Sequence, residues 1–319
     1  MNKKLTPMKK SFKAILKIAA IYMLIQWTPT EVHAQQDPMF TQYFFNPLSI
    51  NSGYAGTREA LNVTLLAREQ WIGVNGRPRT QSLTIHSPLP NDALAAGLTF
   101  QRDEAGPVRN TAIFGDFAYR MRVTENSRLA LGMKAGLSLF TADFASLVGT
   151  EENDVSFMQN LRNKPLPNFG FSAYWWSDRH FVGISTPRLI ENEVDGSDDL
   201  MQGKERRHFF LTAGTVFDLN ATLKLKPTML VRYVNGAPVS FDVTSNLLID
   251  DRLWVGAMYR HGESAGVLTS FSLTEQLRAG YSYDFPLNDL GAYSAGSHEI
   301  MLSYDFFFKN DRTLSPRYF

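Results

Sequence analysis

The chain of 319 residues is long enough for one large domain or two small ones, and its 44% hydrophobic and 20% charged residues are ordinary for a folded protein. Its aromatic content of 13%, with 23 Phe and 12 Tyr, is high and is typical of a protein with aromatic belts at a membrane. The lack of cysteine excludes disulfides, thiol catalysis, Cys-ligated metal sites and a lipid anchor on an N-terminal cysteine.

The segment 1–34 predicts a secretory signal peptide. Five lysines within the segment 3–13 precede an apolar stretch at 14–27, and Val32-His33-Ala34 has the pattern of a cleavage site. Only 18–25 is continuously apolar, well short of the ~20 residues that a spanning helix needs. Cleavage near Ala34 would remove six Lys and one Glu from totals of 32 basic and 31 acidic residues, so the net charge would fall from +1 to −4. That balance leaves no basic patch for nucleic acid.

Residues 35–60 carry many aromatic, Asn and Gly residues together with Pro38 and Pro47, so a regular helix or strand is not expected there. This segment can bury much apolar area for its length, either inside the fold or against a partner. We therefore expect it to act as a plug or a docking segment, at the periplasmic mouth or in the lumen of a barrel. Its candidate partner-binding residues are Phe40, Tyr43, Phe45, Asn46 and Tyr54.

Residues 61–308 indicate one strand after another, because segments of roughly 8 to 14 residues alternate in polarity between runs of Asn, Asp, Gly, Pro or Ser. No stretch of the mature chain holds ~18 consecutive apolar residues, which excludes membrane-spanning helices. The predicted fold class is all-β, a transmembrane antiparallel β-barrel of about 14 strands, an even number that returns both termini to the periplasmic side. The predicted strands are 61–70, 80–87, 93–102, 110–122, 127–141, 167–177, 180–186, 207–218, 221–234, 239–249, 252–260, 264–273, 276–285 and 297–308.

The connections between these strands alternate in length, which supports the same fold. Short connections such as 87–92, 123–126 and 177–179 suit periplasmic turns. The connections at the opposite end are mostly longer, although 235–238 and 261–263 are short. The longer connections, which would face outside, are 71–79, 103–109, 142–166, 187–206 and 286–296. The last segment, 309–319, is predicted to be a C-terminal tail.

Side-chain alternation assigns one face of each strand to lipid and the other to a lumen. In 127–141, Leu131 and Met133 share one face, while Gly132 and Lys134 share the other. A charge facing lipid at mid-depth would cost ~2–4 kcal/mol, so charges are expected inside, where a stabilising network is favoured over a selective pore. The predicted lumen charges are Arg68, Asp116, Arg120, Lys134, Arg232, Arg260, Arg278 and Asp284. A soluble β-sandwich or propeller would alternate too, but the charged second faces and the lack of a repeat of fixed period disfavour it.

Two of the predicted outer loops have unusual compositions. The loop 71–79 offers Trp71, Arg77 and Arg79, residue types that are enriched where proteins bind each other, although an interfacial Trp beside a Pro/Gly turn is an equal alternative. The loop 191–199 holds five carboxylates and could bind Ca²⁺, but their spacing is not that of an EF-hand, and a solvated loop is favoured. The acidic segment 151–154 is interpreted in the same way.

No motif points to catalysis. The six histidines are dispersed, and the chain has no Gly-x-Ser-x-Gly elbow, no phosphate-binding loop and no dinucleotide fingerprint. The sequence therefore predicts that the protein is not an enzyme and that it uses neither a cofactor nor a metal ion.

Several short motifs lie along the mature chain, most densely within residues 35–120. They are Gln35-Gln36-Asp37-Pro38-Met39-Phe40-Thr41-Gln42-Tyr43, Phe45-Asn46-Pro47, Tyr54-Ala55-Gly56, Arg68-Glu69-Gln70-Trp71, Thr80-Gln81-Ser82 with Ile85-His86, Asp103 with Gly106-Pro107, Gly115-Asp116 with Tyr119-Arg120, and Ser315-Pro316-Arg317-Tyr318-Phe319. Together they resemble the PorP/SprF family of type IX secretion system outer-membrane proteins. Ser52-Gly53 departs from the Asn-Pro-Ala-like residues expected at that place.

The resemblance implies an outer-membrane barrel, embedded in lipid, that supports secretion or cell-surface anchoring. Its partners would be the periplasmic ring and peptidoglycan-linked proteins of the type IX machinery, the C-terminal domain of a secreted adhesin, or both. A role in gliding motility stays open, and a passive outer-membrane porin is the alternative function. If the N-terminal segment docks a partner, deleting 36–46 should impair secretion or docking more than barrel stability.

Overall fold

A computed structural model describes residues 38–143, 161–195 and 202–307 of the chain. The predicted signal peptide 1–34, the acidic segment 151–154 and the tail 309–319 lie outside these residues. Among the described residues, no helix is long and apolar enough to cross a membrane.

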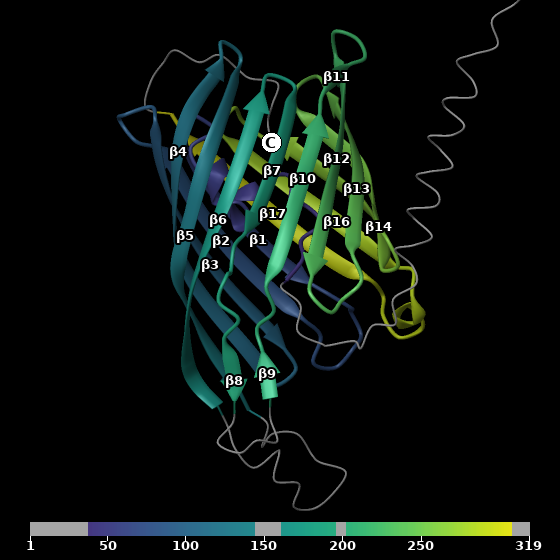
Figure 1. Ribbon diagram of the computed structural model, residues 1–319. Coiled ribbons are helices and arrows are strands. Elements are labelled where there is room, and N and C mark those ends of the chain that lie inside the picture. The colour runs from purple at the N-terminus through teal and green to yellow at the C-terminus, as the bar shows by residue number, and fades with distance from the viewer. Residues whose placement is uncertain (1–37, 144–160, 196–201, 308–319) are drawn as a thin grey trace, which may run out of the picture. The chain divides into compact units, whose positions relative to one another are not determined.

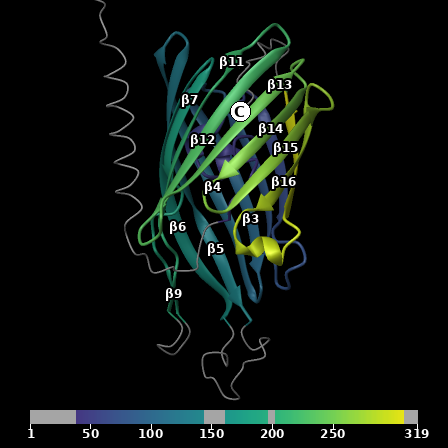
Figure 2. The same ribbon diagram turned by 90° about the vertical axis from the view of Figure 1, so that its right-hand side faces the viewer.

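Fourteen antiparallel strands close into one barrel, which confirms the predicted fold class (Figures 1 and 2). Neighbouring strands along the chain pair with each other, and β1 pairs with β17 to close the wall. The barrel strands are β1 (Leu61–Glu69), β2 (Arg79–Pro88), β3 (Leu94–Ala105), β4 (Val108–Thr124), β5 (Ser127–Ala142), β6 (Leu161–Ser177), β7 (His180–Thr186), β10 (His208–Thr215), β12 (Leu223–Val234), β13 (Ser240–Ile249), β14 (Leu253–Arg260), β15 (Ser264–Ser272), β16 (Leu277–Pro286) and β17 (Ser297–Phe306). The short strand β11 (Phe217–Asp218) extends the pairing of β12, and β8 (Glu193–Asp195) pairs with β9 (Gln202–Lys204) in a separate hairpin.

Two strand boundaries differ from the prediction for identifiable reasons. The expected long connection 103–109 is wrong, because β3 and β4 continue until only Gly106 and Pro107 remain between them, and Gly106 has the positive φ of 56° that so tight a turn requires. The strand expected from 167 starts instead at Leu161. Pro165 and Pro167 lie in regular register opposite Leu139 and Leu137, and the β5–β6 ladder continues beyond them through a register shift between Phe140 and Ala142.

The barrel has two unlike ends. At the short-turn end, brief turns such as 125–126 and 178–179 join the strands. The first barrel strand, β1, begins at this end, and the last, β17, ends there. At the long-loop end lie the connections 70–78, 187–207 and 287–296. In single-chain outer-membrane barrels the short turns and both termini are periplasmic and the longer loops are extracellular, so the long-loop end faces the cell exterior.

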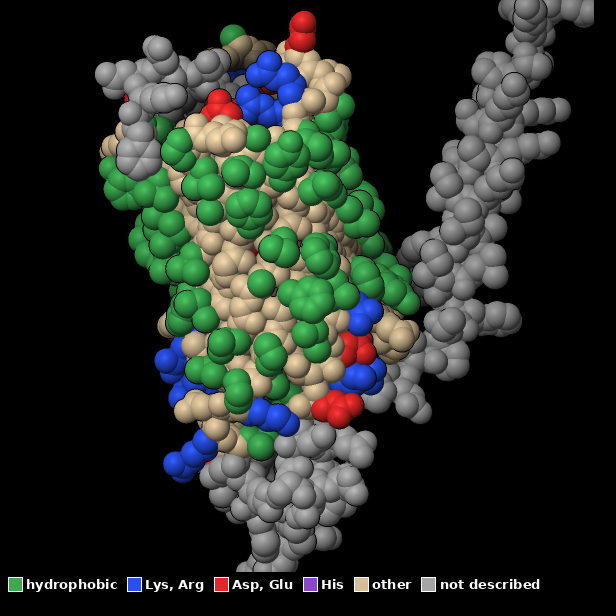
Figure 3. All heavy atoms as spheres, turned by 60° about the vertical axis from the view of Figure 1, so that its left-hand side comes forward, with side chains coloured by type: hydrophobic (Ala, Val, Ile, Leu, Met, Phe, Trp, Pro, Cys, Tyr) green, Lys and Arg blue, Asp and Glu red, His purple; other side chains and the backbone are tan. Residues whose placement is uncertain are grey.

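The wall follows the predicted alternation of side chains. On β5, Leu131 and Met133 point outward and are about half exposed, at 51% and 47%, while Ala130 and Lys134 are buried. Figure 3 shows the result on one side of the wall, where hydrophobic side chains cover the middle and charged side chains gather at the margins. This distribution matches an apolar band between two aqueous interfaces.

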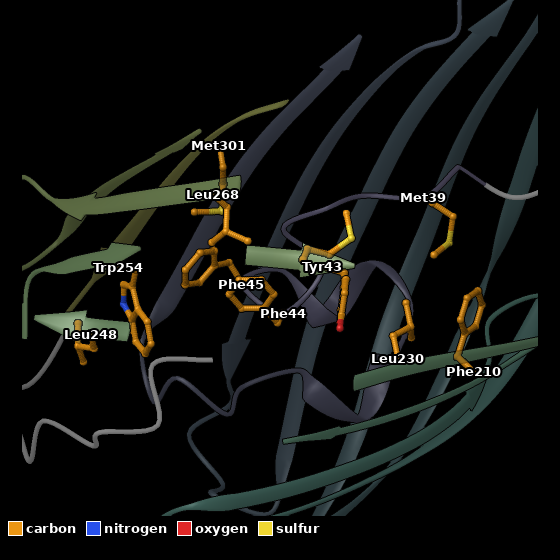
Figure 4. Packing of buried hydrophobic residues seen from close by; sticks show 11 residues of the cluster. Met39, Tyr43, Phe44, Phe45, Phe210, Leu230, Leu248, Trp254, Leu268 and Met301 are labelled. Atoms are coloured by element: carbon orange, nitrogen blue, oxygen red, sulfur yellow. The ribbon is translucent and has the colours of Figure 1, made fainter. Parts of the chain in front are cut away.

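The lumen is filled by residues 38–60, here called the plug. It contains two short 3₁₀ helices, η1 (Pro47–Ser49) and η2 (Ser52–Tyr54), and otherwise irregular backbone. Its aromatic side chains pack against the inner wall, and Figure 4 shows Tyr43, Phe44 and Phe45 among wall residues of β12, β14 and β15. Of the two predicted locations, the periplasmic mouth or the lumen, this segment occupies the lumen.

Candidate functional site

A buried ionic cluster holds the plug near the long-loop end. Glu299 on β17 accepts the backbone N–H groups of Thr41 and Gln42, each at 2.8 Å. Arg68 on β1 pairs with Glu299 at 3.1 Å and with Asp284 on β16 at 2.7 Å, and donates to the Thr41 hydroxyl at 2.8 Å. All five residues are buried, so these charge-assisted bonds fix the plug to three neighbouring strands.

Other buried arginines contact the plug at different levels. Arg260 on β14 pairs with Asp242 on β13 at 2.9 Å and donates to the carbonyl of Phe40 at 3.5 Å. Arg120 on β4 donates to the carbonyl of Gly56 at 2.7 Å, close to the short-turn end. The wall therefore supplies donors along the whole path of the plug. The structure buries all the charges that the sequence placed in the lumen: Arg68, Asp116, Arg120, Lys134, Arg232, Arg260, Arg278 and Asp284.

Several of these charges pair with one another or lie against the plug instead of lining an open path. Lys134 on β5 pairs with Asp116 on β4 at 2.9 Å, and both bond to the hydroxyl of Thr99. The guanidinium of Arg278 lies 5.6 Å from the ring centre of Phe45. Such pairing is what a stabilising network requires, because an unpaired buried charge would be costly.

A lysine in an aromatic cage was missed by sequence reasoning. The ammonium of Lys226 on β12 lies 5.2 Å from the ring of Phe44 and 5.5 Å from that of Trp254 on β14, with Phe45 at 5.9 Å and Phe181 at 6.0 Å. The cage joins two plug residues to two wall residues around one cation. The signal in the sequence was the inward parity of Lys226. Its rings come from three separate parts of the chain, the plug, β7 and β14, which no local pattern brings together.

The plug residues predicted to bind a partner are buried in the barrel. Tyr54 packs edge-on against His86 of β2 and Tyr174 of β6, and the Asn46 side chain accepts a hydrogen bond from Thr84 at 2.9 Å. While the plug is in place, these side chains contact the wall and are closed to a partner. The residues so placed are Phe40, Tyr43, Phe45, Asn46 and Tyr54.

The third predicted group, Trp71, Arg77 and Arg79, lies at the long-loop end. Main-chain hydrogen bonds join its loop to two other connections. Ile72 donates to Gly296 and accepts from Ala295, each at 2.8 Å, and Gly106 of the β3–β4 turn donates to the carbonyl of Gly76 at 2.8 Å. We call residues 70–78, 106–107 and 287–296 the loop platform. The guanidinium of Arg77 pairs with Glu69 at 2.8 Å, which ties the loop to the end of β1. The platform therefore presents its surface in a defined conformation.

The most exposed aromatic residue of the platform was not singled out from the sequence. Tyr293 follows the 3₁₀ helix η5 (Asp289–Ala292) and is 77% exposed, and nearby Leu287 is 58% exposed. Exposed aromatic and aliphatic side chains at a loop tip are typical of protein-binding surfaces. The signal was a Tyr inside a Gly/Ser-rich loop, which the alternation rule does not address.

In the described part of the acidic loop, carboxylates form ion pairs with basic residues of the same connection between β7 and β10. Glu191 pairs with Lys204 at 3.4 Å, and Arg188 pairs with Glu205 at 3.6 Å. Burial acts to raise the pKa of Glu191, but the backbone N–H of Arg207 and the side chain of Lys204 outweigh it and leave that pKa lowered. Within the described residues no cluster of three potential metal ligands occurs. The carboxylates of 198–199 lie outside them.

A closed, plugged barrel with an apolar outer band and structured outer loops defines the class of protein, a β-barrel of the outer membrane. The chain belongs to the family of type IX secretion system membrane proteins PorP/SprF, whose family model matches residues 32–304. Among curated proteins no relative is found.

Solved structures similar to the chain are outer-membrane barrels of low sequence identity. The monoaromatic hydrocarbon channel CymD aligns with a TM-score of 0.51 and 10% identity, covering 88% of this chain and 96% of its own. The outer membrane protein Omp33 of Acinetobacter baumannii aligns with a TM-score of 0.45 and 8% identity, covering 78% of this chain and 99% of its own. The CymD likeness concerns the fold alone.

Proposed function

We propose that this protein is a closed barrel that holds a partner of the type IX secretion system at its loop platform, and that it neither catalyses a reaction nor serves as a diffusion channel. Membership in the PorP/SprF family supports work with that machinery. The observation that carries the proposal is the plug, since residues 38–60 fill the lumen with buried side chains. Recognition then falls to the ends of the barrel, where loops are held on a rigid scaffold.

Under this proposal the exported chain is cleaved near Ala34 and inserts with the platform outside. The platform favours the C-terminal domain of a secreted adhesin as partner, because such a domain is reached from the cell exterior. Periplasmic ring and peptidoglycan-linked proteins would instead meet the short-turn end. Anchoring a surface adhesin is also the way in which the protein would serve gliding motility.

The test compares the protein with a variant carrying Trp71→Ala, Arg77→Ala and Arg79→Ala. We expect the variant to insert normally, because Trp71 and Arg77 lie in a loop and Arg79 is an exposed residue at the start of β2. It should lose most of the secreted protein that co-purifies with the wild type in mild detergent. A companion variant with Leu219→Ala, an exposed residue of the short-turn end, should retain the partner. Full retention of the partner and of its surface display by the triple variant would sink the proposal.

A further inference from the structure

Charged side chains on the outer wall are confined to one region. Among the described residues of the barrel strands, every Asp, Glu, Lys or Arg that alternates outward lies on β1–β6, close to the long-loop end. The outward positions of the other barrel strands are apolar or uncharged. The outward charged residues are Glu69, Arg79, Arg102, Glu104, Arg109 and, beyond the register shift of β6, Arg162.

Strand register arranges these residues in a row around the wall. Glu69 lies opposite Arg79, Arg79 opposite Glu104, and Glu104 opposite Arg109. The row continues on β5 at Thr141, which lies opposite Arg109. The hydroxyl of Thr141 accepts the backbone N–H of Asn163 at 3.2 Å, and Asn163 follows Arg162 on β6. Directly paired positions of successive strands therefore form one continuous row across this part of the wall.

Positive charge exceeds negative charge in this row. Glu104 serves two arginines, Arg102 at 2.6 Å and Arg109 at 2.7 Å, and one carboxylate neutralises only one of them. Glu69 is likewise shared, by Arg79 at 3.6 Å and by Arg77 of the platform. Arg162 forms no ion pair with any described residue.

A pocket of about 390 Å³ opens between the last two arginines. Its lining residues include the carboxylate Asp143 beside the two arginines, and the others are Thr111, Leu139, Thr141, Ala142, Leu161 and Asn163. Immediately toward the middle of the membrane lie Ile113 and Leu137, which are 47% and 39% exposed in the apolar band. The pocket thus combines hydrogen-bond donors with an apolar floor at the depth where lipid headgroups meet acyl chains.

We propose that this pocket binds the phosphate of a lipid in the outer leaflet, with the acyl chains lying along Ile113, Leu137 and Leu139. Guanidinium groups hold phosphate through paired, charge-assisted hydrogen bonds, and two of them face this pocket. A lipid fits better than a soluble partner because the pocket lies on the outer face of the barrel wall. The next outward positions on the same strands meet hydrocarbon. This site goes beyond partner recognition by the platform, which faces the cell exterior.

The experiment uses lipid A carrying its phosphates and the same lipid A without them, added to the purified barrel in neutral detergent and followed by native mass spectrometry. The double variant Arg109→Gln, Arg162→Gln removes the two pocket arginines. Arg179→Gln, an exposed arginine at the short-turn end, is the matched control. Heat-modifiable migration on gels confirms that each variant is folded.

We expect the wild type and the control to bind phosphorylated lipid A and to discriminate against the dephosphorylated form. The double variant should bind the phosphorylated form roughly 5-fold more weakly for each arginine lost, on the order of 25-fold in all. Equal binding by the folded double variant, or equal binding of both lipids by the wild type, overturns the proposal. Inorganic phosphate that competes as strongly as the lipid would make this a free-phosphate site and overturn it too. Unchanged lipid binding with loss of a co-purifying protein would assign the pocket to a protein partner, which also overturns it.

Discussion

Glu299 shows how a single buried carboxylate connects distant parts of this chain. It accepts two backbone N–H groups of the plug and pairs with Arg68, although these partners lie near the opposite end of the sequence. The donors on Thr41, Gln42 and Arg68 are buried, so they would be left unsatisfied if the acceptor were lost. Glu59, whose carboxylate pairs with Arg128 at 3.0 Å but is exposed, lacks this constraint.

We therefore expect Glu299→Gln to destabilise the barrel by about 1–3 kcal/mol. The amide has one acceptor oxygen where the carboxylate has two, so a buried donor of the cluster loses its acceptor, while Arg68 keeps its pair with Asp284. Glu59→Gln should change stability by less than about 1 kcal/mol, since exposed ion pairs contribute little. Urea titration followed by heat-modifiable migration measures both. A Glu299→Gln variant as stable as Glu59→Gln would show that the cluster does not hold the plug.

The plug and the wall approach each other too closely in places for any side chain. A Cβ atom on Gly132, which faces inward on β5, would lie 2.2 Å from the backbone nitrogen of Gly53 in the plug and 2.4 Å from the hydroxyl of Ser172. On the neighbouring strand, Gly115 faces outward, and its nearest atom would be 3.8 Å away. Gly132 is therefore a position where only a shift of the plug admits a larger residue.

Planar-bilayer recordings test whether the plug closes the lumen. The intact protein should give almost no stable open steps, and Gly132→Ala should raise their frequency because the plug must move away from β5. Gly115→Ala, which meets no backbone atom at short range, should behave as the wild type. Stable open steps from the intact protein would favour the passive porin, and equal recordings from the two variants would show that the plug adapts without opening a path.

The barrel as a unit depends on a division of environments between its two faces. Outward residues at mid-depth meet hydrocarbon, as the exposed apolar positions along the wall indicate, while inward residues meet the plug and the ionic network. Charge is tolerated outward only at the margin, where the arginine-bearing row lies. The cost of a misplaced charge should therefore depend on depth.

Met133→Arg places a cation on the outer face near mid-depth and should destabilise the inserted barrel by about 2–4 kcal/mol. Val123→Arg places the same group close to a turn at the short-turn end, where the cost should be about 0–1 kcal/mol. Folding titrations into lipid vesicles compare the two. Equal costs at both positions would contradict the orientation of the wall.

Much of the wall could be predicted from the sequence, and the plug's role only in part. The number of strands and the inward parity of residues such as Lys134 and Arg260 follow from alternation alone. From the sequence, deletion of 36–46 was expected to impair secretion or docking more than barrel stability, because the sequence shows only that the segment is irregular. The structure gives that segment a large buried contact and a share of the ionic cluster, so a loss of stability is now the expectation.

Sequence by itself determined which face of each strand meets lipid, because the period of two is local and a charge in hydrocarbon is costly wherever it lies. Only the tertiary structure decided which buried charges meet, where the plug runs and how the outward arginines line up. Those contacts depend on barrel closure and on register between strands far apart in the chain, and no local pattern encodes them. From the sequence alone, Arg109 is one charged residue near the end of a strand. In the folded barrel it lies in a row of charged residues and beside a pocket.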